Sequence, residues 1–285
     1  MTTRDEGAVR TWGMRDGARL HYRHWNAEAP RGAVVAIHGI QSHGGWYVAS
    51  CAHLAAAGYE VWFLDRRGSG LNTFGRGDVR DYRVFVDDLC EVLTEVRRRV
   101  AGEPVHLEAI SWGSKLACAT LILHPELADS LMLLGPALVP RVDVSFADKL
   151  RVAASLVTNP TRLFDVPLND ARLFTANPER IAYIENDALS LRKCTARFLY
   201  QTRRLDRFVR RNARKMRTPT LLMLAGHDPI VDNDAVRRLF EEFALPRKEV
   251  IIYDEAHHTL EFEPDPGRVF EDMVRWLDRC SPSGS

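Results

Sequence analysis

The first segment with chemical potential is a serine between small residues, at an expected strand-to-helix junction. Ala109-Ile110-Ser111-Trp112-Gly113 ends one apolar run and precedes a helical pattern that starts at Ser114. A sharp turn here requires small residues two positions before and two after the serine, and Ala109 and Gly113 satisfy this, with alanine replacing the usual first glycine. Such a turn would expose the Ser111 hydroxyl as a nucleophile for acyl transfer. Because any strand-to-helix loop can hold a Ser-x-Gly, the segment needs partners elsewhere.

An acid and a base follow two later apolar runs. Asp228 comes directly after residues 220–225, and His257 and His258 come after residues 250–253. The carboxyl ends of parallel strands share one edge of a sheet, so we expect these groups to lie near Ser111. Asp228 would orient a histidine, which would act as general base and then as general acid. Asp232 is better explained as the N-cap of the next helix.

Acyl transfer also needs donors for the negative charge that develops on the carbonyl oxygen. His38-Gly39-Ile40 follows the apolar run 33–37, and this segment predicts a tight turn after a strand. We expect the backbone N–H groups of Ile40 and Trp112 to form this oxyanion hole. The residues identify no metal site, and the expected chemistry requires no metal or organic cofactor.

Positioning these groups requires alternating strands and helices. Short apolar runs alternate with helical patterns, which is typical of an α/β fold with a mostly parallel sheet. The runs predict eight strands, at residues 8–14, 18–25, 33–37, 60–64, 105–110, 131–134, 220–225 and 250–253. The alternation breaks over 139–215, where helical patterns occur with no convincing strand. We therefore expect residues 1–138 and 216–285 to form one core domain that is interrupted by a helical insertion.

Charge is concentrated in that insertion. The 285-residue chain has a formal net charge of only +1, whereas residues 139–215 contain 16 basic and 8 acidic side chains. A near-neutral chain without a recognisable motif argues against a nucleic-acid partner. The basic insertion is explained either as a solvated helix face or as a surface for an anionic substrate, a carrier protein or a lipid surface.

The cysteines and the apolar segments bear on location. The chain has 5 cysteines, without C-x-x-C spacing, which favours reduced thiols. Residues 1–10 hold no apolar stretch typical of a secretion signal, and no run is long enough to be a transmembrane segment. These features predict a cytoplasmic protein, and they leave its oligomeric state open.

Together these residues resemble the α/β-hydrolases, and within them the monoacylglycerol lipase and lysophospholipase branch, also described as serine aminopeptidase-like. The order Ser111, Asp228, His258 matches that fold family. The resemblance also rests on the segments His38-Gly39, Leu64-Asp65-Arg66-Arg67-Gly68-Ser69-Gly70, Gly226-His227-Asp228 and His258-Thr259-Leu260-Glu261-Phe262-Glu263.

The resemblance implies three things about this chain. It implies the α/β-hydrolase fold, with residues 139–215 as a helical cap (lid) over an acyl pocket. It selects His258 over His257 as the base. It also implies a serine hydrolase that cleaves carboxylic esters with an apolar or lipid-like acyl group.

Other functions remain open at this point. The basic insertion also fits a thioesterase, or an enzyme for an anionic or carrier-bound acyl group. Ser111-Trp112-Gly113-Ser114 and His124-Pro125-Glu126 resemble proline iminopeptidases, although the His-Gly-Gly-Pro-Gly loop of that group is absent. A non-catalytic ligand-binding protein on the same fold is the remaining alternative.

Overall fold

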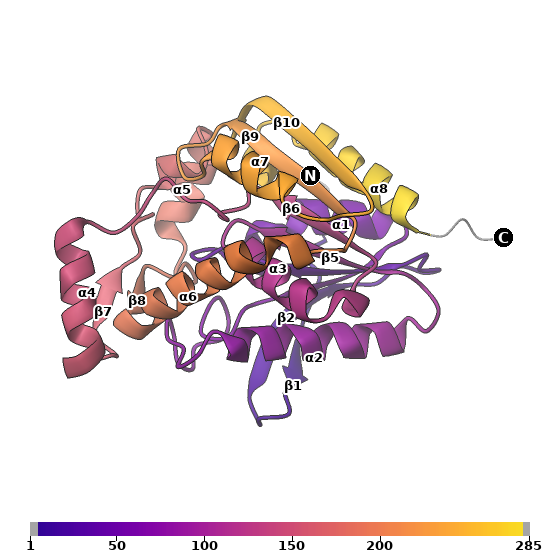
Figure 1. Cartoon of the computed structure of the whole chain (residues 1–285). Coiled ribbons are helices and arrows are strands. Elements are labelled where there is room, and N and C mark those ends of the chain that lie inside the picture. Colours follow the sequence, from indigo (N-terminus) through magenta and orange to yellow (C-terminus); the bar gives the residue numbers. More distant parts are fainter. Residues whose placement is uncertain (1–4, 282–285) are drawn as a thin grey trace.

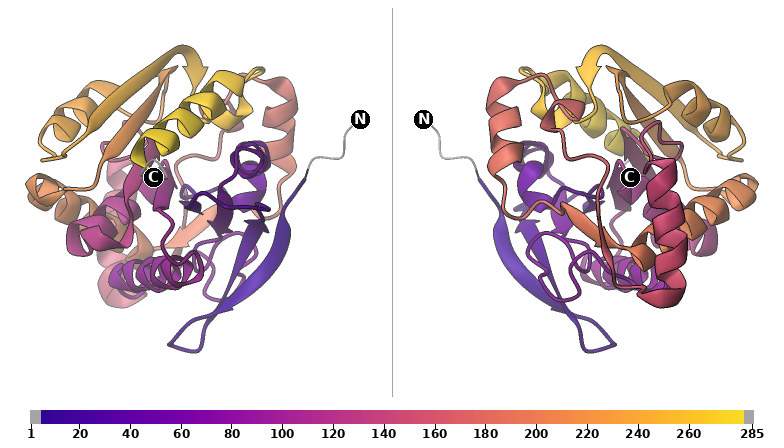
Figure 2. Two further views of the ribbon diagram at one scale, coloured as in Figure 1. Left: turned by 90° about the vertical axis from the view of Figure 1, so that its right-hand side faces the viewer. Right: turned by 90° about the vertical axis from the view of Figure 1, so that its left-hand side faces the viewer.

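The central element is an eight-stranded, mostly parallel sheet, which confirms the fold class expected from the sequence. The computed structural model describes residues 5–281 (Figure 1). The strands are β1 Ala8–Gly13, β2 Arg19–Trp25, β3 Ala33–Ile37, β4 Glu60–Leu64, β5 Val105–Ile110, β6 Ser130–Leu134, β9 Thr220–His227 and β10 Lys248–His257. Their order in space is β1-β2-β4-β3-β5-β6-β9-β10. Strand β2 pairs antiparallel with β1 and β4, and the remaining pairs are parallel. The β1–β2 hairpin extends from one side of the molecule (Figure 2).

Helices cover both faces of this sheet. The α-helices outside the insertion are α1 Val48–Ala56, α2 Arg83–Arg99, α3 Gly113–Leu123, α7 Asn233–Glu241 and α8 Gly267–Cys280. Helix α1 packs with α8, and α2 packs with α3. Helix α1 starts at Val48, after a 3-10 turn over Gly44–Trp46. Asp232 caps α7 as expected, because its Oδ1 accepts from the Ala235 N–H at 3.0 Å.

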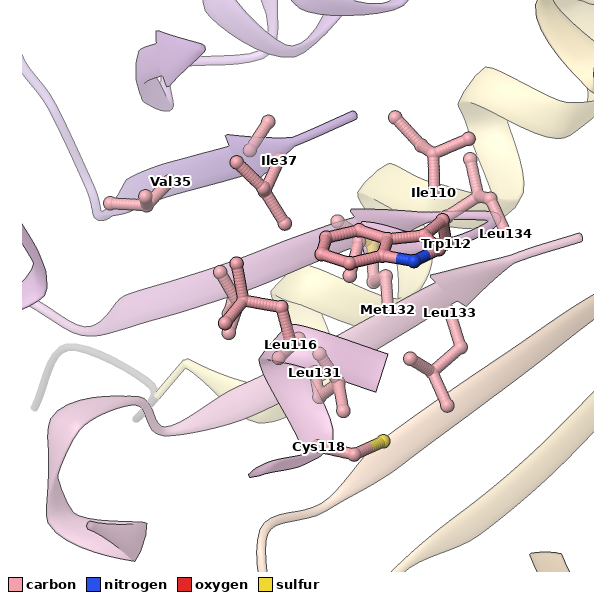
Figure 3. Close-up of a cluster of buried hydrophobic side chains, with 14 of the residues drawn as sticks. Val35, Ile37, Ile110, Trp112, Leu116, Cys118, Leu131, Met132, Leu133 and Leu134 are labelled. Atoms are coloured by element: carbon pink, nitrogen blue, oxygen red, sulfur yellow. The ribbon is translucent and has the colours of Figure 1, made fainter. Parts of the chain in front are cut away.

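The central strands are buried on both faces, which explains why they appear in the sequence as continuous apolar runs. Every residue of β3, β5 and β6 is buried. Figure 3 shows their side chains packed with those of α3. The residues labelled there are Val35, Ile37, Ile110, Trp112, Leu116, Cys118, Leu131, Met132, Leu133 and Leu134. This core fixes the strand ends from which the polar groups project.

Residues 139–215 connect β6 to β9 and contain more than helices. Their α-helices are α4 Phe146–Thr158, α5 Pro178–Asn186 and α6 Ala196–Asn212. The expectation of no strand here was wrong, because β7 Leu163–Asp165 and β8 Lys193–Thr195 form an antiparallel pair. Each has only three residues, which is too short to show an alternating pattern. Figure 1 shows α4, α5 and this strand pair gathered on one side, while α6 packs along α3.

Polar contacts join this insertion to the rest of the chain. The Asp187 carboxylate accepts from the Trp46 indole N–H at 2.8 Å and contacts His43 Nε2 at 3.0 Å. Asp78 accepts from the Thr195 hydroxyl at 2.6 Å and from the Arg197 Nε–H at 2.6 Å. The contacts of Asp187 and Asp78 bring α5 and α6 against the loops that follow β3 and β4.

Within residues 5–281, no helix combines the length and the apolar character needed to span a bilayer.

Candidate active site

Ser111 occupies a strained turn between β5 and α3. Its φ is +51°, and among residues 5–281 it is the one non-glycine residue with positive φ. Such strain persists only where the surroundings impose it, and it is common at functional sites. A Cβ at Gly113 would lie 2.6 Å from the His38 carbonyl oxygen, so glycine is required there. Ala109 is fully buried in β5, where its methyl group replaces the usual glycine without exposure.

The structure brings Ser111, His258 and Asp228 together from three separate strand ends. His258 Nδ1 lies 2.8 Å from Asp228 Oδ2, and His258 Nε2 lies 3.0 Å from Ser111 Oγ. Since a carboxylate only accepts, Nδ1 carries the proton and Nε2 is free to accept from the Ser111 hydroxyl. The three residues are 3–6% exposed, so water competes little for these hydrogen bonds.

Local backbone geometry holds the acid and the base. The second oxygen of Asp228, Oδ1, accepts from the N–H groups of Ile230 at 2.8 Å and Val231 at 3.0 Å. Phe174, in the insertion, packs edge-on against the His258 ring at 5.9 Å. His257 takes a different direction, because its Nδ1 contacts Glu263 Oε1 at 3.2 Å. Of the two adjacent histidines, only His258 therefore faces the serine.

The expected oxyanion donors lie beside Ser111. Ile40, Ser111 and Trp112 line the same cavity. A Cβ at Gly39 would come within 3.2 Å of Ser111 Cβ, which shows how closely this loop approaches the serine. In the described part of the chain, neither the Ile40 N–H nor the Trp112 N–H donates to a protein acceptor. Both donors are thus available to a ligand oxygen.

Two buried residues lie behind this loop, namely His38 of the expected His-Gly turn and Arg66, to which the sequence analysis gave no role in the site. The Arg66 N–H donates to His38 Nε2 at 2.9 Å, so the neutral His38 ring carries its proton on Nδ1 and donates to the Gly39 carbonyl at 2.7 Å. Burial holds the pKa of His38 well below its usual value, which keeps the ring neutral. The Gly39 carbonyl belongs to the same peptide unit as the Ile40 N–H, so His38 fixes the direction of that donor.

A cavity of about 300 Å³ opens above Ser111. Its wall is mainly apolar and comes largely from the insertion, with α4 residues such as Val152 and Leu156, and Leu199 of α6. This volume lies at the lower end of the range for small-molecule sites.

Comparison with known proteins agrees with this architecture. Residues 28–265 match the model of the serine aminopeptidase S33 family. The chain belongs to this family. Within this α/β-hydrolase fold, Ser111 lies at the turn from β5 to α3.

Curated relatives of similar length include two lipid-cleaving proteins. The chain is 26% identical to phospholipase YtpA of Bacillus subtilis over 258 residues, which is 90% of this chain and 98% of the relative. It is also 26% identical to a monoacylglycerol lipase of Mycolicibacterium smegmatis over 266 residues, covering 92% and 93% of the two chains.

Solved structures share the fold. The monoacylglycerol lipase of Paleococcus ferrophilus superimposes with a TM-score of 0.80 at 22% identity, covering 92% of this chain and 99% of that chain. A soluble variant of the Saccharomyces cerevisiae monoglyceride lipase, in complex with a substrate analogue, has a TM-score of 0.85 at 21% identity, covering 99% and 98%. The likeness extends over the insertion as well as the sheet.

Proposed function

We propose that this protein hydrolyses a carboxylic ester with an apolar, lipid-like acyl group through an acyl-enzyme on Ser111. The main support for this proposal is the continuous series of hydrogen bonds from Asp228 through His258 to Ser111, which ends at an apolar cavity. The names of the curated relatives support the same class of substrate.

The geometry suggests how the reaction proceeds. His258 Nε2 takes the Ser111 proton as Oγ attacks the ester carbonyl, and the Asp228 carboxylate stabilises the imidazolium that forms. The N–H groups of Ile40 and Trp112 stabilise the tetrahedral oxyanion. His258 then returns the proton to the leaving alkoxide. A water molecule, activated by the same histidine, finally cleaves the acyl-enzyme.

Residues 139–215 serve in this proposal as a cap over the acyl chain. The support comes from the cavity, whose apolar wall is built from α4 and α6, and from the Phe174 ring against His258. The cap excludes water from the acyl chain while leaving Ser111 reachable from the cavity.

An ester substrate agrees better with the cavity than a peptide with a free N-terminus. An aminopeptidase needs carboxylates for the substrate ammonium group. The cavity wall instead presents Lys115, Lys149 and Arg203 against Asp143 and Asp206, so positive charge is in excess.

The first test is Ser111→Ala. We expect kcat on a p-nitrophenyl acyl ester to fall by roughly 10⁴–10⁶-fold, because triad residues act as a unit. A fluorophosphonate probe should label the wild type with one equivalent and leave the variant unlabelled. Near-normal turnover by the folded variant, or a wild type that resists the probe, would contradict the proposal.

The second test compares the adjacent histidines. His258→Ala should lower kcat about as much as the serine variant, because it removes the general base. His257→Ala should keep most of the activity, since its ring contacts Glu263 and not Ser111. The reverse ranking in the same ester assay would assign the base to His257.

A further inference from the structure

One wall of the cavity above Ser111 carries charge that the proposed ester hydrolysis does not use. Lys115 comes from the first turn of α3, Arg203 and Asp206 come from α6, Asp143 from the loop after β6, and Lys149 from α4. We call these five residues the charged wall. The remaining lining is mainly apolar, so a ligand in this cavity meets an apolar surface and a charged one together.

The five groups form one alternating chain. Lys115 Nζ lies 2.7 Å from Asp206 Oδ1, and the other oxygen of Asp206 is 3.9 Å from Arg203 Nη1. Arg203 Nη2 donates to Asp143 at 2.9 Å, and Lys149 Nζ lies 2.8 Å from the same carboxylate oxygen. Three cations thus share two carboxylates, which leaves one positive charge in excess on this wall.

Lys115, at the buried end of this row of charges, is the group whose burial costs the most. The Lys115 side chain is only 4% exposed, and burial lowers the pKa of its ammonium. An ammonium has three donors, and Asp206 is already shared with Arg203. Helix α3 is otherwise almost entirely apolar and buried, so packing alone does not call for a cation at this position.

We propose that the charged wall is a subsite for one anionic group on the substrate, a carboxylate or a phosphate, so that the preferred ester is amphipathic and anionic. This inference rests on the proposed ester hydrolysis and specifies its substrate class. The apolar wall takes the hydrocarbon part of the substrate. Lys115 and Arg203 bind its anionic group, which balances the positive charge that the two carboxylates of the charged wall leave in excess.

Two matched substrate pairs test the subsite. The p-nitrophenyl ester of hexanoic acid and the p-nitrophenyl monoester of adipic acid differ by a charge on the acyl side. A monoacylglycerol and its phosphate differ by a phosphate group on the alcohol side, which carries about 1.5 to 2 negative charges at neutral pH. The measurement is kcat/KM for each compound, at low and high salt, with monomeric substrate.

We expect the charged member of at least one pair to be preferred, and the preference to weaken at high salt. Arg203→Gln should reduce the preference at least about tenfold. Arg203 is half exposed, so this variant should fold normally. Lys115→Met combined with Asp206→Asn, which removes both buried charges, should reduce the preference in the same way.

Arg207→Gln is the matched control, because Arg207 lies on the exposed face of α6 outside the cavity lining. It should leave the preference unchanged. A preference for the neutral member in both pairs, or a charge preference that survives Arg203→Gln, overturns the subsite. Failure of ester hydrolysis itself would appear separately, as absence of turnover on every ester and absence of fluorophosphonate labelling.

An independent observation concerns Arg66, behind the expected oxyanion hole. Its guanidinium is 2% exposed and lies against the rings of Trp112 at 4.8 Å, Phe85 at 5.4 Å and Phe198 at 5.4 Å. Its Nη2–H donates to the Ile40 carbonyl at 2.9 Å, while Nε and Nη1 have no partner among the described residues. Burial lowers the pKa of Arg66 to about 9, so the group is charged at neutral pH.

A cation held in this way opposes folding and needs another reason to be present. Burying a charge without a carboxylate partner costs folding free energy, so an apolar side chain of similar size in its place should be neutral or stabilising. Arg66 touches both residues that are expected to supply the oxyanion N–H groups, Ile40 by a hydrogen bond and Trp112 by ring stacking. We infer that Arg66 is a positioning residue that fixes the oxyanion loop and places a positive charge behind it.

Arg66→Met, which fills the aromatic cage without charge, tests this role. We expect kcat on p-nitrophenyl hexanoate to fall about tenfold to hundredfold, with KM nearly unchanged. The affinity for a boronic acid, which forms an anionic tetrahedral adduct with Ser111, should fall by the same factor. The melting temperature should stay the same or rise.

Arg66→Lys keeps the charge and should retain more of kcat than Arg66→Met. An unchanged kcat, an unchanged boronic acid affinity, or a loss of activity that follows a lower melting temperature would each overturn the inference. Fluorophosphonate labelling of the wild type tests the underlying ester hydrolysis separately.

Discussion

The two faces of the sheet beside Ser111 hold buried ionisable groups in opposite situations. On the face covered by α3, which is the cavity face because Lys115 of this helix also lines the cavity, Lys115 is paired with Asp206 at 2.7 Å. On the face covered by α1, Glu108 of β5 is fully buried and neither carboxyl oxygen has a partner within residues 5–281. Burial, and then the neighbouring Glu261, raise the pKa of Glu108 to about 8.

This difference shows two ways in which a fold tolerates a buried titratable group. A charge survives where another element supplies the opposite charge, as α6 does for Lys115. Glu108 shows the second way, because its buried carboxyl group takes the neutral form at neutral pH instead. Only the first arrangement leaves a charge that a ligand can recognise.

The largest expected effect on stability comes from breaking the pair on the cavity face. Asp206→Asn leaves Lys115 buried without its carboxylate and should lower the free energy of unfolding by about 3 kcal/mol. Urea denaturation at neutral pH measures this value. The double variant with Lys115→Met should recover most of the loss, and the absence of recovery would mean that the two groups are not coupled.

A smaller effect, with a defined pH dependence, is expected on the opposite face. Because the folded pKa of Glu108 lies above the unfolded value of about 4.3, the unfolded chain releases this proton first as the pH rises. The wild type therefore loses stability between about pH 4 and pH 8 through this group.

Glu108→Gln removes that loss. The free energy of unfolding of the variant minus that of the wild type should be larger at pH 8 than at pH 5, by at least about 2 kcal/mol. Unfolding free energies of both proteins across this range provide the measurement. A difference that does not vary with pH would place a partner beside the Glu108 carboxyl.

The smallest expected effect concerns Glu261, which does have partners on that same face. Its carboxylate accepts from the N–H groups of Ala49 at 2.9 Å and Ser50 at 3.2 Å, at the start of α1. Burial raises the pKa of Glu261 to about 7 despite these contacts. Glu261→Ala should cost about 1 kcal/mol, as the loss of an N-terminal cap does. A cost equal to that of Asp206→Asn would remove the contrast between the two faces.

The sheet was predictable because its signals are local. Apolar runs predicted the eight strands, and small residues around Ser111 predicted the turn that its positive φ now requires. The same reasoning failed for β7 and β8, because three-residue strands carry no periodic pattern. It also missed Lys115 and Arg66 as parts of the site, although a lone lysine within the apolar helix 113–123 was a visible signal.

The sequence by itself determined the order of elements and the strand ends that carry Ser111, Asp228 and His258. Local turn and periodicity signals are written in neighbouring residues, so they can be read without a structure. The tertiary structure alone decided which buried polar groups are paired. Lys115 meets Asp206 and Arg66 meets Ile40 across different elements, while Glu108 meets no partner in the part of the chain that the structure describes. Such pairings depend on the packing of α6 and the loops against the sheet, and no local pattern encodes that distance.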